Sequence, residues 1–149
     1  MKRLLPVLTL LALLAGCRTE QQQTDTSSTT ATSPSATQCY AYVSATDTIR
    51  LTMTRTGDNV TGTLLYNLAG KDQNTGTLSG RMRGDTLLAD YRFRSEGTES
   101  VREVAFVVQE GRLVEGYGPV VEQPGKMAFR NSSALTFSAT MPLTPADCP

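Results

Sequence analysis

The sequence predicts an all-β fold, an antiparallel meander of about eight to nine strands that closes into an up-and-down β-barrel. Two observations lead to this prediction. From Cys39 onward, apolar and polar residues alternate with a period of two, and glycine-containing breaks recur roughly every ten residues. Closure would remove the exposed edges that an open meander of this length leaves. A two-sheet β-sandwich is the alternative architecture for the same pattern.

Residues 1–16 have the features of a lipoprotein signal peptide. Lys2 and Arg3 form a basic start, and the apolar run from Leu4 to Leu14 is too short for a permanent membrane span. The sequence Leu14-Ala15-Gly16-Cys17 resembles the lipobox of bacterial lipoproteins. This resemblance implies cleavage before Cys17, a diacylglycerol on its thiol and a further acyl chain, such as palmitate, on the new amino group. An ordinary secretory signal ending near a cysteine is the alternative.

Residues 17–38 combine the lipidated Cys17 with an expected disordered, Ser/Thr-rich tether. The segment from Arg18 on has almost no apolar residues, so it cannot bury enough surface to offset its ordering entropy. A flexible coil of this length spans roughly 25 Å. In bacterial lipoproteins an Asp after the lipidated cysteine marks inner-membrane retention. Arg18 at that position therefore favours a lipoprotein of the cell envelope anchored in the outer membrane.

Short turns fix the register of the expected strands in residues 39–149, which should form one β-barrel domain. Gly57-Asp58 and Gly84-Asp85 place glycine first in a two-residue loop, which suits a type II′ hairpin turn. Glu96-Gly97 and Glu110-Gly111 are weaker signals for two-residue turns. The four loops together predict eleven pairs: Met53–Gly62, Leu51–Leu64, Ile49–Tyr66, Met82–Leu87, Gly80–Ala89, Leu78–Tyr91, Phe93–Ser100, Tyr91–Arg102, Ala89–Val104, Leu87–Phe106 and Val108–Leu113.

The last turn also pairs Phe106 with Glu115 and Val104 with Tyr117. All these pairs fall on one inner face, and a shift of one residue at any turn would exchange the faces. The inner face includes Gly62 and Gly80, where glycine permits a sharp bend or a close backbone approach.

The remaining segments complete the expected meander. Cys39–Val43 forms the first strand, and Ala69–Asn74 is a longer loop. Residues 119–125 are expected to be a loop, followed by short strands at 127–130 and 135–138. Strands in this sequential order best fit a barrel of the lipocalin or streptavidin kind.

Cys39 and Cys148 lie at the two ends of the expected domain. Export places them in an oxidising compartment, where a disulfide between them is the expected outcome. It would close a loop of about 110 residues. A redox pair of the CxxC type is excluded because the two cysteines are far apart in sequence and no second pair exists.

Composition limits the functions that the chain can have. Without residues 1–16 it carries 12 basic and 14 acidic side chains, which gives no electrostatic footprint for nucleic acid. The chain has no His, the commonest general base and transition-metal ligand. It also has no glycine-rich phosphate loop and no nucleophile–base arrangement, so neither a cofactor, a metal nor an enzymatic activity is expected.

Five polar residues on the predicted inner face form the candidate binding site: Arg102, Tyr91, Tyr117, Tyr66 and Glu115. A buried Arg must be paired, and Arg102 could bind a carboxylate or phosphate bidentately in a ligand cavity. Alternatively, Arg102 lies at the rim and binds loop carbonyls, Glu96 or Glu99 in a closed barrel. Glu115 beside Phe106 could have a raised pKa, or it could reach water or an Arg.

The outer face is rich in Thr and Arg, which cross-strand pairs such as Arg94–Glu99 explain as a solvated surface. The arginines could instead meet an acidic polymer such as lipopolysaccharide. Two tripeptides, Asp47-Thr48-Ile49 and Asp85-Thr86-Leu87, look like the Asp-Ser/Thr-apolar O-glycosylation signal of Bacteroidota, although Asp-Thr is also ordinary at strand starts.

The stretch from Asp47 through Gly118 resembles small uncharacterised lipoproteins of Bacteroidota-type bacteria. This resemblance supports an envelope location and a β-fold and implies no known activity. The leading hypothesis is a lipid-anchored, non-enzymatic module that binds a small or amphipathic ligand. A structural or assembly subunit that acts through its outer surface is the alternative, and a small-molecule or envelope-protein partner is expected accordingly.

Overall fold

A computed structural model describes residues 35–149 of the chain. The predicted signal peptide, Cys17 and the tether up to residue 34 lie outside the described residues. Within residues 35–149 every regular element is a strand, so the all-β prediction is confirmed. The strands are β1 (Ser35–Val43), β2 (Thr48–Thr56), β3 (Asn59–Asn67), β4 (Asn74–Arg83), β5 (Thr86–Ser95), β6 (Thr98–Gln109), β7 (Arg112–Tyr117), β8 (Val120–Gln123), β9 (Lys126–Phe129), β10 (Thr136–Phe137) and β11 (Thr144–Pro145).

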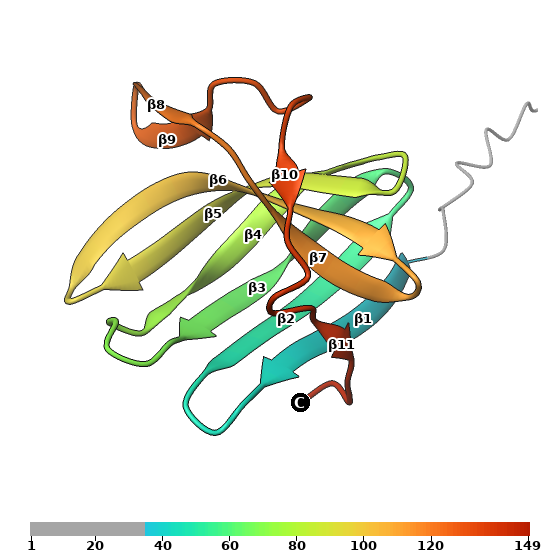
Figure 1. The fold of residues 1–149 in the computed structure, drawn as a ribbon. Coiled ribbons are helices and arrows are strands. Elements are labelled where there is room, and N and C mark those ends of the chain that lie inside the picture. Colours follow the sequence, from blue (N-terminus) through green and yellow to red (C-terminus); the bar gives the residue numbers. More distant parts are fainter. Residues whose placement is uncertain (1–34) are drawn as a thin grey trace, which may run out of the picture. The chain divides into compact units, whose positions relative to one another are not determined.

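The first seven strands form an antiparallel meander in which each strand pairs with the next (Figure 1). The registers predicted from the four turns are those observed, for example Leu51 with Leu64 and Tyr91 with Arg102. At Gly57 and Gly84 φ is 61°, as a type II′ turn requires of its first central residue. The turns after β5 and β6 instead have positive φ at both central residues, with the glutamates at 49° and 52°, as in a type I′ turn.

The predicted pair between Val104 and Tyr117 is wrong. The β6–β7 ladder keeps the predicted register but ends one residue earlier, at Ala105 and Gly116, and Tyr117 pairs with Thr136 of β10 on the other edge of β7. Tyr117 is therefore 46% exposed and lies at the edge of the inner face.

The predicted loop over residues 119–125 is also wrong, since β8 and β9 form a hairpin there with Gln123 opposite Lys126. Pro119 and Pro124 made the strand hard to predict, because prolines on both sides of a short apolar run are typical of loops. In addition, β9 pairs in parallel with β6 at a single bridge, so the sheet is mixed and not a pure up-and-down meander.

The hairpin β8–β9 and the chain after it cover part of the outer face that the sequence predicted to be solvated. Ala105, Val114 and Ala128 are almost fully buried there. The ring of Phe137 lies so close to Gly116 that a Cβ on this glycine would be 2.6 Å from it.

Strand β1 begins at Ser35, four residues before the predicted start at Cys39. The expected tether is therefore wrong for its last four residues. Strand β2 extends to Thr56, so every residue of β1 back to Ser35 has a partner in the ladder with β2. The hydroxyls of Thr37 and Thr54 lie 2.9 Å apart and share a hydrogen bond on this extension.

The sheet order runs β10-β7-β6-β5-β4-β3-β2-β1-β11, and no ladder joins β7 directly to β1 among the described residues. Residues 136–146 contact both of these strands. They pair with β7 through β10 and through Leu143, which exchanges two 2.9 Å backbone hydrogen bonds with Leu113. They pair with β1 through β11, and Ala146 N–H donates to the Cys39 carbonyl at 2.8 Å.

The inner face of the meander forms the core. Its largest fully buried side chains include Tyr91, Phe106, Ile49, Leu51, Leu64 and Leu87. Gly80 permits the close backbone approach that the sequence predicted, since a Cβ there would lie 2.2 Å from the Leu88 carbonyl oxygen. Gly62 is equally constrained, with 2.0 Å to the Thr52 carbonyl oxygen. The predicted disulfide is confirmed between Cys39 and Cys148, with 5.2 Å between their Cα atoms.

Candidate ligand-binding site

Arg102 projects from β6 onto the inner face, where its guanidinium lies over three aromatic rings. The distances from its Cζ atom to the ring centroids are 5.1 Å for Tyr66, 5.5 Å for Phe93 and 5.7 Å for Tyr91. Tyr91 and Phe93 stack at 4.9 Å between centroids. Such contacts with aromatic faces stabilise a cation and fix the plane of the guanidinium.

Arg102 lacks a counter-ion within residues 35–149, because none of the ion pairs in this range includes it. Its Nε atom is buried and has no hydrogen-bond partner there. The alternative partners that the sequence suggested are not used: Glu99 pairs with Arg92 at 2.7 Å, and Glu96 makes no ion pair. A half-buried guanidinium without a partner is costly, so its surroundings favour an added acceptor.

Glu115 projects from β7 on the same face and accepts a hydrogen bond on each oxygen. Tyr66 Oη donates to Oε1 at 2.6 Å, and Tyr117 Oη donates to Oε2 at 3.0 Å. Burial raises the pKa of Glu115, whereas the two tyrosine hydroxyls and the charge of Arg102 act in the opposite direction. Burial and the carboxylate also raise the pKa of Tyr66 far above its ordinary value, which keeps this hydroxyl a donor.

These groups line a cavity of about 350 Å³ that opens to solvent, a size within the usual range of small-molecule sites. Its walls come from the inner face, the β3–β4 loop and the chain before β11. The lining residues are Tyr66, Leu68, Lys71, Asp72, Asn74, Ser95, Arg102, Glu115, Tyr117 and Met141. The Oδ1 atom of Asn74 is buried without a partner, as is Arg102 Nε; these are the two such side-chain atoms within residues 35–149.

Four of the five predicted site residues therefore meet at this cavity, and Tyr91 does not. Tyr91 is fully buried behind Arg102, where its hydroxyl donates to the Leu64 carbonyl at 2.9 Å. Burial raises its pKa to about 12. Its role is structural support for the guanidinium.

The sequence did not indicate the rest of the lining. Asn74 is the first residue of β4 and lies opposite Tyr66 in the β3–β4 ladder. Lys71 and Asp72 lie in a loop whose path no periodicity reveals, and Met141 is in an irregular segment far along the chain.

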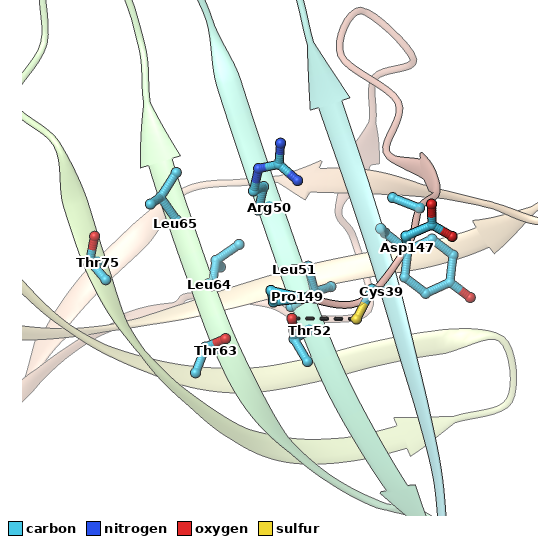
Figure 2. Close-up of a pocket in the computed structure, with 12 residues that line it drawn as sticks. Cys39, Arg50, Leu51, Thr52, Thr63, Leu64, Leu65, Thr75, Asp147 and Pro149 are labelled. Carbon is cyan, nitrogen blue, oxygen red and sulfur yellow. Dashed lines mark hydrogen bonds between the residues drawn. The ribbon is translucent and has the colours of Figure 1, made fainter.

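A second pocket, of about 300 Å³, lies between strands β1 to β3 and the C-terminal residues (Figure 2). Leu51, Leu64 and Leu65 provide much of its apolar wall, and Thr52 Oγ1 lies 3.5 Å from the Cys39 sulfur. The disulfide sulfur carries no hydrogen, so the Thr52 hydroxyl is the donor. No buried unpaired polar atom of the described range lies in this pocket, so it has fewer features that would orient a ligand.

No cluster of three or more His, Cys, Asp or Glu residues suited to a metal ion occurs within residues 35–149. The same range contains no helix long and apolar enough to cross a membrane. Comparisons with protein families, with curated proteins and with solved structures found no match to this chain.

Proposed function

We propose that this protein is a lipid-anchored protein of the cell envelope whose β-domain binds a small or amphipathic ligand without converting it. The observation that carries the proposal is the coincidence of two unsatisfied groups at one cavity, Arg102 Nε and Asn74 Oδ1. Native proteins rarely leave such atoms unpaired, so each requires a partner, which a bound molecule or an ordered water can supply.

The cavity suits a ligand with a polar head and an apolar part. An anionic head would bind the Arg102 guanidinium, whose plane is already fixed by the rings of Tyr66 and Phe93. The apolar part would pack against Leu68 and Met141. Glu115 supports binding over acid–base chemistry, because both of its oxygens already accept hydrogen bonds from tyrosines.

The fold of this domain is proposed to be a barrel whose seam is spanned by residues 136–146. Support comes from the pairing of that segment with both β7 and β1. In this arrangement the cavity lies at one mouth of the barrel, where barrels of this size bind single small ligands.

The anchor of the proposed lipoprotein is Cys17, because the sequence Leu14–Cys17 resembles a lipobox. Intact mass of the native protein should show residues 1–16 missing and acyl chains on Cys17, and Cys17→Ser should move the protein from the outer membrane to the soluble envelope fraction. An unmodified Cys17 in the native protein would disprove the anchor.

Native mass spectrometry of the protein extracted from its own membrane tests the binding function. A retained small molecule is expected on the wild type and should be lost in Arg102→Ala. Arg94→Ala, which removes an exposed arginine on the outer face, is the matched control and should keep the ligand. A wild type without ligand, or a ligand equally retained by both variants, would contradict binding at this cavity.

The alternative function, a structural or assembly subunit, is favoured by one observation. The hairpin β8–β9 exposes Val120 and Met127, at 48% and 40%. If a protein partner co-purifies without any small molecule and is lost in a Val120→Asp, Met127→Asp variant, this surface and not the cavity carries the function.

A further inference from the structure

We infer, on the basis of the proposed binding function, that the ligand is a zwitterion. Its oxyanion would bind Arg102, its ammonium group would lie on the side of Glu115 and Asn74, and its apolar part would face Leu68 and Met141. The amino and carboxylate groups of a hydrophobic α-amino acid satisfy this description, and so does the headgroup of an ethanolamine phospholipid.

The lining of the cavity is balanced in charge. It carries two cationic side chains, Lys71 and Arg102, and two anionic ones, Asp72 and Glu115. A ligand with only a negative charge is attracted by Arg102 and Lys71 and repelled by Asp72 and Glu115, so the lining as a whole gives it little net attraction. A ligand with both charges and no net charge gains at both sides.

Arg102 and Glu115 share the cavity without touching. They make no direct ion pair; burial raises the pKa of the Glu115 carboxyl, and the guanidinium charge of Arg102 acts against this rise. The ring of Tyr66 lies between them: its face contacts Arg102, and its hydroxyl binds Glu115. Two opposite charges therefore line one cavity of about 350 Å³ without neutralising each other in an ion pair.

The two unpaired atoms have opposite hydrogen-bonding character. Arg102 Nε is a donor and requires an oxygen acceptor, whereas Asn74 Oδ1 is an acceptor and requires an N–H or O–H donor. Asn74 lies opposite Tyr66 in the β3–β4 ladder. The hydroxyl of the same Tyr66 donates to Glu115. The acceptors Asn74 and Glu115 are thus both neighbours of Tyr66, and this side of the cavity suits a donor such as an ammonium group.

The test uses calorimetric titration of the full chain in a non-ionic detergent, so that the detergent adds no charged group. The four probes are L-phenylalanine, N-acetyl-L-phenylalanine, phenethylamine and sn-glycero-3-phosphoethanolamine, the phosphodiester headgroup of an ethanolamine phospholipid. The second probe lacks the ammonium group and the third lacks the carboxylate. We expect L-phenylalanine to bind about tenfold or more tightly than either truncated probe, because each loses a charge-assisted hydrogen bond.

Two variants assign the charges to residues. Arg102→Met should abolish the advantage of L-phenylalanine over phenethylamine, and Glu115→Gln should reduce its advantage over N-acetyl-L-phenylalanine. Far-ultraviolet circular dichroism checks that both variants are folded, and Arg94→Ala again serves as the control. Tighter binding of sn-glycero-3-phosphoethanolamine than of L-phenylalanine supports the zwitterion and identifies the lipid headgroup as its source.

Equal affinity for L-phenylalanine and N-acetyl-L-phenylalanine would overturn the zwitterion and leave an anion-binding module standing. Binding of none of the four probes, together with an Arg102-dependent ligand in native mass spectrometry, would likewise overturn the zwitterion and keep the proposed function. If no probe binds and no ligand is retained, both the zwitterion and the proposed function are refuted.

Discussion

The disulfide between Cys39 and Cys148 gives the most quantitative prediction for stability. It joins β1 to the C-terminal residues across a sequence separation of 109. We predict that a Cys39→Ala, Cys148→Ala variant folds to the same structure and loses about 3–5 kcal/mol of unfolding free energy. The upper end of this range comes from the loop-closure entropy of the unfolded chain, which corresponds to a stabilisation of about 4.8 kcal/mol for a loop of this length.

The folded state should keep its arrangement without the bond. The same residues are held by the hydrogen bond from Ala146 N–H to the Cys39 carbonyl and by the pairing of β11 with β1. The loss of stability therefore arises mainly because the unfolded chain gains conformational entropy without the disulfide. The unfolded chain also exposes more surface, so the slope of the unfolding free energy against urea concentration should become steeper.

Urea unfolding followed by tyrosine fluorescence measures both quantities, since the chain has five tyrosines and no tryptophan. Wild-type protein reduced with a thiol serves as the control and should match the variant, because it loses the bond and keeps both sulfurs. A loss below about 1 kcal/mol, or an unchanged denaturant slope, would refute the entropic origin of the stabilisation.

Three further predictions concern single residues. Gly76→Ala should destabilise the fold by about 2–3 kcal/mol, because the new Cβ would lie 1.9 Å from the Arg92 carbonyl oxygen. Thermal unfolding measures this loss. Ser79→Ala, at an exposed position of the same strand, is the control and should leave the stability unchanged. Tyr91→Phe should cost about 1 kcal/mol of unfolding free energy, because it removes the buried hydrogen bond to Leu64; a neutral result would show that the carbonyl needs no donor. The pKa of Glu115 is raised in the folded state, so stability should fall as pH rises from the unfolded value of 4.5 through the folded pKa. Glu115→Gln should flatten that slope in urea titrations between about pH 4 and 7, and an unchanged slope would contradict a raised pKa.

The pairing of neighbouring strands could be predicted from the sequence wherever a two-residue turn joined them. Once Gly84-Asp85 is a turn, the period of two determines that Leu78 faces Tyr91, and the observed ladder agrees. The same rule extended the β6–β7 ladder one pair too far at Tyr117, because the period of two sets the register of a ladder and not the residue at which it ends.

The candidate site divides in the same way. Alternation along β6 and β7 is enough to predict that Arg102 and Glu115 lie on the inner face, where both are found. The opposite wall, at Lys71, Asp72 and Met141, could not be predicted, because it is formed by irregular segments whose positions depend on tertiary contacts.

The double pairing of residues 136–146 has a consequence for the order of folding. Strand β1 is the first strand of the described range to be made, yet its second neighbour, β11, is synthesised last. The two ends of the sheet cannot be joined until the whole chain is present, and contacts over such long sequence separations make folding slow. A chain with this topology emerges from the ribosome without its final contacts, so β1 keeps one unpaired edge until β11 has been made.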